Sequence, residues 1–293
     1  MLSSSVTSGE VVLAVRELPH PGAPTVLLVH GFPDTQRMWE PLARRLQERH
    51  HLRVVSYDTR GAGGSTAPSG RAGYRTERLV DDLVAVLDAT APDVPVHLVG
   101  HDWGSVQLWE AVNTAGSDPR LRHRIASFTS ISGPPLDYLS HVLREAVRRR
   151  DLGLLQSQAR KSWYVYAFQV PWLPELAVRR LGRPLRALLQ RTQRLDDAHW
   201  SETFEDDAAH GINLYRANVG RLLSPPRRTR VPVQLIVPEH DTFLDARLFD
   251  QLGDYVSNIT QVSLRAGHWA PRTHADLVAR LIADHVSAHL NVE

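Results

Sequence analysis

Cysteine is absent from the 293-residue sequence, and lysine occurs only once, at Lys161. Without cysteine the chain has no disulfide, no thiolate nucleophile and no cysteine-ligated zinc or iron–sulfur site. No apolar run approaches the roughly 20 residues that a membrane-spanning helix requires, and the amino terminus lacks the basic flank and long apolar stretch of a signal peptide. We therefore expect a soluble, cytoplasmic protein without a membrane span.

A strong charge of either sign is also missing. The 34 Lys and Arg residues and the 32 Asp and Glu residues give a formal net charge of +2, so we expect no nucleic-acid partner. Hydrophobic residues at 42% and charged residues at 23% are ordinary values for a globular protein that can bury a core. The length fits one large domain or two of about 150 residues. These numbers leave the oligomeric state open, with a homodimer as one option.

Short apolar runs alternate with segments of helical periodicity over residues 1–133. The runs 11–15 and 25–29, separated by prolines and a glycine, predict a hairpin-like pair of strands. Further strands are predicted at 54–57, 96–99 and 125–131, and helices at 38–50, 74–91 and 102–115. Alternation of this kind is typical of the α/β class, with a mostly parallel sheet covered by helices on both faces.

The alternation stops at residue 134. Residues 134–228 are helical in pattern, rich in arginine and too long for a loop. The α/β pattern then resumes, with strands predicted at 231–237 and 259–264 and helices at 244–252 and 274–290. We therefore predict one core, formed by residues 1–133 and 229–293, that is interrupted by a helical cap of residues 134–228. Arginine runs such as 148–150 predict a solvated helix face, with a surface for an anionic partner as the alternative.

The segment VHLVGHDWGSVQLW carries the strongest local signal for chemistry. A predicted buried strand ends at Gly100, and a helix follows Asp102 with Gly104 in its first turn. This is the G-x-nucleophile-x-G pattern of a nucleophile elbow, with aspartate at the nucleophile position. Free N–H groups at a helix N-terminus favour a carboxylate anion, and an ionised aspartate needs no partner base. The alternative is that Asp102 only caps the helix.

The sequence also offers an oxyanion hole. LLVHGFPD ends a predicted strand in a loop where this architecture supplies one backbone N–H, and the residue after the nucleophile supplies the second. These two donors are Phe32 and Trp103.

An acid and a histidine complete the expected triad. Asp241 in IVPEHD follows a predicted strand, and His268 in RAGHWAP follows the last one. The chain order of nucleophile, acid and histidine is that of α/β-hydrolases, and each member stands at the carboxyl end of a strand. Glu239 and His240 remain alternatives to Asp241 as the acid.

At these residues the chain resembles the epoxide hydrolases of the α/β-hydrolase fold. HGFPD, YDTRGAGGST, VGHDWG, PEHD and GHW occur in family order and cover essentially the whole chain. The aspartate in GHDWG narrows the resemblance to epoxide hydrolases and the related dehalogenases. The chain is also similar to the hydrolase portion of actinobacterial proteins that join such a hydrolase to a short-chain dehydrogenase. Whether it is a stand-alone protein or one portion of such a protein stays open.

The resemblance implies conversion of a small apolar epoxide and water to a vicinal diol through a covalent aspartyl ester. Asp102 is then the nucleophile, and His268, oriented by Asp241, activates the water. Two cap tyrosines of the family hold and protonate the epoxide oxygen. SWYVYAFQ and the pattern Y-R-x-N place them at Tyr164, with Tyr166 as a competitor, and at Tyr215.

The same resemblance implies an apolar substrate pocket, which we expect Phe32, Trp103, Trp269 and the cap aromatics to line. It implies no cofactor and no metal. The histidine pairs 50/51 and 285/289 have spacings that would suit a metal, but neither has a matching carboxylate. The other histidines, His101 among them, are expected at the surface or the core edge.

Two other functions remain as alternatives. A dehalogenase has the same Asp–His–Asp triad but stabilises a halide. Fluoroacetate-type enzymes place arginines just after the nucleophile, where this chain has none, and haloalkane-type enzymes usually have asparagine at the position of Phe32. The second alternative is a ligand-binding protein that keeps the fold without turnover.

Overall fold

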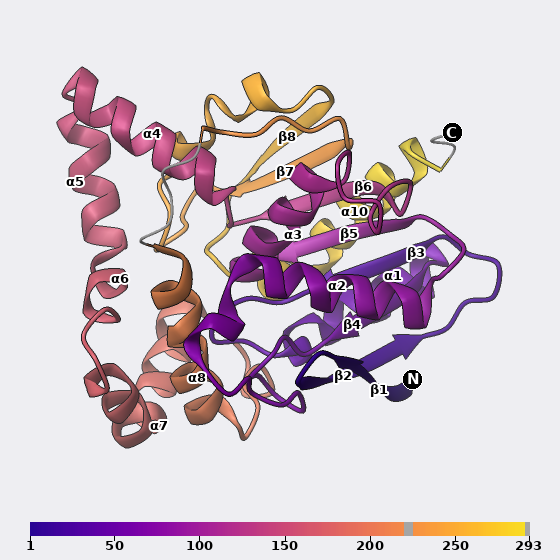
Figure 1. Cartoon of the computed structure of the whole chain (residues 1–293), viewed down its shortest axis with the longest axis horizontal. Helices are drawn as coiled ribbons and strands as arrows, with labels where there is room; N and C mark the ends of the chain where they lie inside the picture. Colours follow the sequence, from indigo (N-terminus) through magenta and orange to yellow (C-terminus); the bar gives the residue numbers. More distant parts are fainter. Residues whose placement is uncertain (220–224, 291–293) are drawn as a thin grey trace.

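An eight-stranded sheet forms the centre of the computed structural model, which describes residues 1–219 and 225–290. Its strand order is β1-β2-β4-β3-β5-β6-β7-β8 (Figure 1). The β1–β2 and β2–β4 pairs are antiparallel, and the other five pairs are parallel. The strands are β1 (Leu2–Ser8), β2 (Val11–Leu18), β3 (Thr25–Val29), β4 (Arg53–Tyr57), β5 (Val96–His101), β6 (Ile125–Ile131), β7 (Val233–Pro238) and β8 (Ile259–Leu264). The predicted mostly parallel sheet is confirmed.

The predicted hairpin between residues 11–15 and 25–29 is wrong. Residues 11–15 belong to β2, which pairs with β1 and β4, whereas β3 pairs in parallel with β4 and β5. The hairpin that forms joins β1 to β2. The sequence of β1, LSSSVTS, buries only Val6 and Ser8, so it has too little apolar alternation to be recognised as a strand. Pairing with β2 at the edge of the sheet defines it.

Both faces of the sheet are covered by helices, because its central strands are apolar on both sides. In β3, Leu27 and Val29 join the core on the side of α2 and α3, while Val26 and Leu28 join the core on the side of α1, α9 and α10. Burial of each such side chain contributes about 1.5–3 kcal/mol. The helices are α1 (Glu40–His50), α2 (Thr76–Thr90), α3 (Trp103–Thr114), α9 (Ala270–Thr273) and α10 (Ala275–Ala288).

The predicted helix at 244–252 is replaced by two short 3₁₀ helices, Ala246–Phe249 and Leu252–Tyr255. The carboxylate of Asp245 accepts a hydrogen bond from the backbone N–H of Arg247 and begins a tight turn. Periodicity alone did not reveal this local competition.

In the described residues, five α-helices lie between β6 and β7, and no strand lies within 134–228. We call them the helical insertion: α4 (Leu136–Arg149), α5 (Leu152–Lys161), α6 (Trp163–Ala167), α7 (Leu173–Gln193) and α8 (Phe204–Asn218). Figure 1 shows them at one side of the sheet, with α8 between α7 and the rest of the molecule. Their division from the core as a cap domain stays a prediction. Residues 220–224 and 291–293 of the predicted domains lie outside the described residues.

Within the described part of the chain, no helix combines the length and the apolar character needed to cross a membrane.

Candidate active site

Asp102 stands at a sharp turn between β5 and α3. Its backbone angles, φ 52° and ψ −123°, are ones that residues with a side chain rarely adopt, and such strain concentrates at functional sites. The following helix packs so closely against β3 that a Cβ on Gly104 would overlap the carbonyl oxygens of Val29 and His30. The spacing G-H-D-W-G is therefore needed for the turn, and the turn presents the carboxylate at the N-terminus of α3.

The two predicted oxyanion donors are brought to this carboxylate. The backbone N–H of Phe32 donates to Oδ1 of Asp102 at 2.7 Å, and the backbone N–H of Trp103 also stabilises its charge. Burial raises the pKa of Asp102 to about 6, against the opposing effects of His268 and the two N–H groups. The carboxylate is thus mostly ionised at neutral pH.

His268 lies between two carboxylates. Its Nδ1 is 3.0 Å from Oδ2 of Asp241, a hydrogen bond, whereas its Nε2 is 3.8 Å from Oδ2 of Asp102. The longer distance exceeds hydrogen-bonding range. Oδ1 of Asp241 accepts hydrogen bonds from the backbone N–H groups of Phe243 and Leu244, at 2.8 and 3.2 Å. The bond to Asp241 fixes the orientation of the imidazole and leaves Nε2 facing Asp102.

His268 and Asp241 each stabilise the charged form of the other. Burial by itself lowers the pKa of His268, but the charge and hydrogen bond of Asp241, aided by Asp102, raise it above its ordinary value. Burial likewise acts to raise the pKa of Asp241, but the charge and hydrogen bond of His268, together with the hydrogen bond from the backbone of Phe243, lower it below its ordinary value. Glu239 and His240, the alternatives for the acid, are both exposed to solvent. The structure brings Asp241 to His268.

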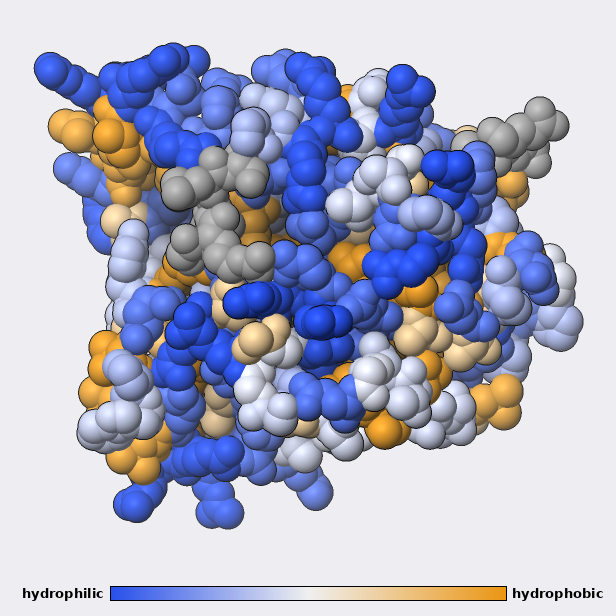
Figure 2. Space-filling view, in the orientation of Figure 1, coloured by the Kyte–Doolittle hydropathy of each residue, from blue (hydrophilic) through white to orange (hydrophobic). Residues whose placement is uncertain are grey.

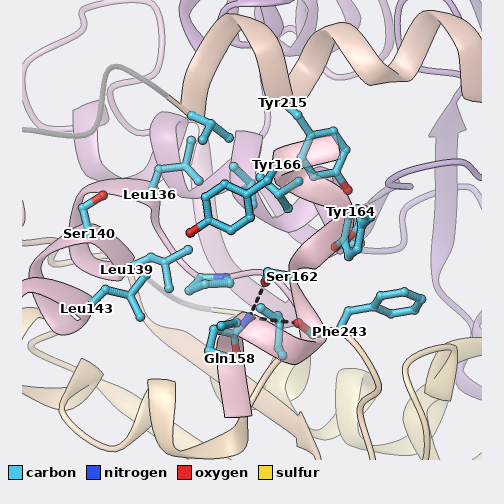
Figure 3. Close-up of a pocket in the computed structure, with 18 of the residues that line it drawn as sticks. Leu136, Leu139, Ser140, Leu143, Gln158, Ser162, Tyr164, Tyr166, Tyr215 and Phe243 are labelled. Atoms are coloured by element: carbon cyan, nitrogen blue, oxygen red, sulfur yellow. Dashed lines mark hydrogen bonds between the residues drawn. The ribbon is translucent and has the colours of Figure 1, made fainter. Parts of the chain in front are cut away.

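A cavity of about 640 Å³ adjoins Asp102 and Trp103. Its wall is largely apolar and includes Leu136, Leu139, Leu143, Val147, Leu155 and Val165. Figure 3 shows the α4 side chains along one side of the cavity and Tyr164, Tyr215 and Phe243 on the other. The carboxyl ends of β5, β6 and β7 and the helical insertion enclose the space together, as expected for a site at the carboxyl edge of a parallel sheet.

Both predicted cap tyrosines line this cavity. The rings of Tyr164 and Tyr215 meet edge to face, with centroids 5.7 Å apart. Burial raises the pKa of each phenol, and the nearby charge of Asp102 raises it further, so both hydroxyls keep their protons and remain donors at neutral pH. Tyr166 lines the cavity too, but its residue is 71% exposed. Because Tyr164 is buried near Asp102 and Tyr166 is largely exposed, Tyr164 is favoured over Tyr166 as the first cap tyrosine.

Two of the three aromatic residues expected at the pocket do not line it. Trp269 is 2% exposed and donates its indole N–H to Oδ2 of Asp34 at 2.8 Å. The ring of Phe32 packs against Phe168 and Tyr215 instead. Trp103 lines the cavity as expected. The side chains of Phe32 and Trp269 turn away because aromatic packing and a buried carboxylate hold them in the layer behind the site.

The expectation that His101 lies at the surface or core edge is wrong. Its side chain is fully buried, its Nε2 lies 2.9 Å from the carbonyl oxygen of His268, and the two rings are 4.6 Å apart. Burial lowers the pKa of His101 to about 3, so this neighbour stays neutral and adds no positive charge beside His268. The feature of the sequence that could have indicated this buried position is that His101 stands in GHDWG, directly before Asp102.

Helix α5 holds the loop that carries the acid. Lys161, the only lysine of the chain, donates to the carbonyl oxygens of Asp241 and Leu244. Gln158 donates to the carbonyl oxygen of Phe243 at 3.0 Å (Figure 3). Its side-chain oxygen accepts from the backbone N–H of Asp245 at 2.9 Å. No sequence motif indicated these contacts, because they join segments about 80 residues apart. No group of three or more histidine or acidic residues in the described ranges is arranged to hold a metal.

Comparison with known proteins identifies the family of this chain. A model of the alpha/beta hydrolase fold matches residues 24–275. The chain is 36% identical over 286 residues to "Probable oxidoreductase EphD" of Mycobacterium tuberculosis, covering 94% of this chain and 47% of that protein, so it spans about half of that relative. It is 26% identical to human "Epoxide hydrolase 4", covering 89% of this chain and 72% of that one.

Among solved structures, an epoxide hydrolase from Bacillus megaterium in complex with an inhibitor superposes with a TM-score of 0.77. The superposition covers 97% of this chain and 100% of that one at 20% sequence identity. At that identity the likeness shows the fold.

Proposed function

Because this chain belongs to the alpha/beta hydrolase fold family and has epoxide hydrolases among its relatives, we propose that it hydrolyses an apolar epoxide to a vicinal diol. One observation carries the proposal. The ionisable carboxylate of Asp102 and the protonated hydroxyls of Tyr164 and Tyr215 border the same apolar cavity. A nucleophile and two proton donors are what opening of an uncharged, strained ether requires.

In the first step Asp102 attacks an epoxide carbon. Phe32 holds Oδ1, so Oδ2 is the oxygen free to attack. A bond forms from Oδ2 to carbon as the carbon–oxygen bond of the ring breaks, and its electron pair goes to the epoxide oxygen. Tyr164 and Tyr215 donate hydrogen bonds to that oxygen and supply its proton. The product is a glycol monoester on Asp102. General acid assistance of this kind contributes about 10²- to 10⁴-fold.

In the second step His268 removes a proton from a water molecule, which attacks the ester carbonyl carbon. The negative charge that develops on Oδ1 is stabilised by the N–H groups of Phe32 and Trp103, one of which already lies 2.7 Å from that oxygen. Collapse of the tetrahedral intermediate breaks the bond between Cγ and the diol oxygen, and His268 returns the proton to the departing diol. Asp241 stabilises the imidazolium in between. The second proton of the attacking water, left on the carboxyl group of Asp102, passes through solvent to the phenolate that protonated the epoxide oxygen, so both groups regain their starting state.

The helical insertion acts in this proposal as the cap of residues 134–228. It supplies both tyrosines, from α6 and α8, and most of the apolar wall. Apolar enclosure excludes bulk water from the alkylation step and matches a substrate with little polar surface. Two hydroxyl donors also suit an alkoxide leaving group better than the halide that a dehalogenase must stabilise.

Trapping the ester tests the proposal. The His268→Gln variant is incubated with styrene oxide and examined by intact mass. We expect an adduct with the mass of the epoxide, mapped to the peptide that contains Asp102, while the wild type forms diol. His240→Gln replaces a nearby exposed histidine and should keep wild-type turnover. Absence of both adduct and wild-type diol formation would refute the proposal.

A further inference from the structure

Large apolar side chains gather on the outside of the helical insertion. Of the fifteen that are exposed in the described residues, ten lie between residues 147 and 188. They are Val147, Leu152, Trp163, Tyr166, Val170, Trp172, Leu173, Leu176, Leu181 and Leu188. Figure 2 shows apolar surface at the left edge of the molecule, over the region of α4 to α7. Isolated exposed leucines need no explanation, but a concentration of this kind marks an interaction site.

The same stretch is strongly basic. Residues 147–194 contain eleven arginine and lysine residues against two acidic residues, Asp151 and Glu175. Their net charge of +9, set against +2 for the whole chain, leaves −7 for the remainder. Exposed arginines of α7, namely Arg180, Arg183 and Arg191, have no ion pair with any described residue. We call the exposed side chains of residues 147–194 the basic apolar face.

Helix α7 shows how this face is built. Val178 and Gly182 point towards the protein, and Val178 packs beside α8. Leu173, Leu181 and Leu188 of the same helix are nevertheless exposed, with arginines among and beside them. A helix face that only contacts solvent would be polar, so the prediction of a solvated arginine face does not account for these exposed leucines. Apolar residues flanked by arginines are the composition of helices that lie in the interface of a lipid bilayer.

The cavity opens onto the same face. Val147 and Tyr166 both line the cavity, and they are 63% and 71% exposed. Along α4, Leu136, Leu139, Leu143 and Val147 recur at helical spacing and form one wall from the site to the surface. Eleven residues of helix span about 16 Å. An apolar path therefore connects Asp102 with the basic apolar face.

We propose that the basic apolar face docks on an anionic lipid bilayer and turns the mouth of the cavity towards it. Leucine and tryptophan side chains enter the boundary between headgroups and acyl chains, while the arginines contact anionic headgroups. The acidic remainder of the molecule is repelled, so the charge distribution also selects the orientation. An apolar substrate dissolved in the bilayer then reaches the cavity without crossing water. This last point rests on the proposed epoxide hydrolysis, whereas the docking does not.

Vesicle sedimentation tests the docking without any substrate. The full chain is mixed with vesicles of phosphatidylglycerol and phosphatidylcholine, or of phosphatidylcholine alone. We expect binding to the anionic vesicles that is at least tenfold stronger than to the neutral ones and that falls as salt is added. The variant Arg180→Glu/Arg183→Glu/Arg191→Glu should lose at least tenfold in binding. The matched variant Arg71→Glu/Arg122→Glu/Arg280→Glu carries the same change of charge on exposed residues outside the face and should lose less than twofold.

The apolar part of the face is tested by Leu176→Ser/Leu181→Ser/Leu188→Ser. We expect loss of vesicle binding, with diol formation from styrene oxide in buffer kept within twofold. Equal binding by the two arginine variants, or no binding by the wild type, would overturn the proposal. So would a wild-type dimer in sedimentation velocity that the leucine variant dissociates, without vesicle binding, because the face would then join two copies of the chain. Vesicle binding without diol formation refutes the hydrolase and supports the docking.

Discussion

Replacing Asp102 with asparagine should make the protein more stable at neutral pH. The side chain of Asp102 is 16% exposed, and burial raises its pKa from the ordinary 3.8 to about 6. Between these values the native protein binds a proton that the unfolded chain has released. Stability therefore falls as the pH rises from about 4 to about 6, and above this interval the ionised carboxylate costs about 3 kcal/mol, at about 1.4 kcal/mol for each tenfold change. Asparagine has nearly the same shape and carries no charge.

Urea unfolding of the two proteins, followed by the fluorescence of the seven tryptophans, measures this cost. The stability difference, variant minus wild type, should be small near pH 4 and should grow by about 3 kcal/mol by pH 7.5. Taking a difference removes the contribution of all other titrating groups that the substitution leaves unchanged. Asparagine also keeps a carbonyl oxygen that accepts from Phe32.

Asp93→Asn is the matched control, because it removes an exposed carboxylate from the loop before β5. Its effect should stay within about 0.5 kcal/mol over the same pH range. A constant difference between Asp102→Asn and the wild type, or a wild type that is the more stable at pH 7.5, would show that the site does not hold its carboxylate at an energetic cost.

Three further variants have defined outcomes. Gly104→Ala should destabilise the fold by about 3 kcal/mol or prevent folding, because a methyl group there overlaps the carbonyl oxygens at the end of β3, and thermal unfolding measures this. Asp241→Asn should lower the pKa of His268 and slow ester hydrolysis by about 10⁴-fold, so the aspartyl ester accumulates in quenched-flow mass spectrometry. The double variant Tyr164→Phe/Tyr215→Phe should slow single-turnover alkylation by at least about 10²-fold, and undiminished diol formation would contradict the assignment of these tyrosines.

The residues next to Asp102 could be found in the sequence because strand ends place them there. Each candidate follows a short apolar strand, so its position along the sheet is fixed by local pattern and by the parallel topology. The aspartate in GHDWG and the histidine in GHW both follow such strands, and the structure places Nε2 of His268 3.8 Å from Oδ2 of Asp102. The apolar pattern also predicted the strand at β7, but it did not predict β1, where few side chains are buried.

The local sequence pattern did not predict contacts between distant segments. The hydrogen bonds that Lys161 and Gln158 make to the loop carrying Asp241 join α5 to the end of β7. The position of Trp269 behind the site depends on Asp34, more than 200 residues earlier. Such contacts follow from how helices pack on the sheet, and no spacing in the sequence encodes them.

The sequence by itself determined the α/β class and predicted Asp102, Asp241 and His268 as nucleophile, acid and histidine at strand ends, because these features depend on residue type and on local backbone periodicity. Tyr164 and Tyr215 were predicted from the resemblance to epoxide hydrolases. Only the tertiary structure decided which aromatic side chains border the cavity, that burial raises the pKa of Asp102 to about 6, and that arginines and leucines of residues 147–194 are exposed together on the helical insertion. Burial, distance and exposure arise when segments far apart in the chain pack together, and these quantities set both the chemistry of the carboxylate and the surface through which the cavity opens.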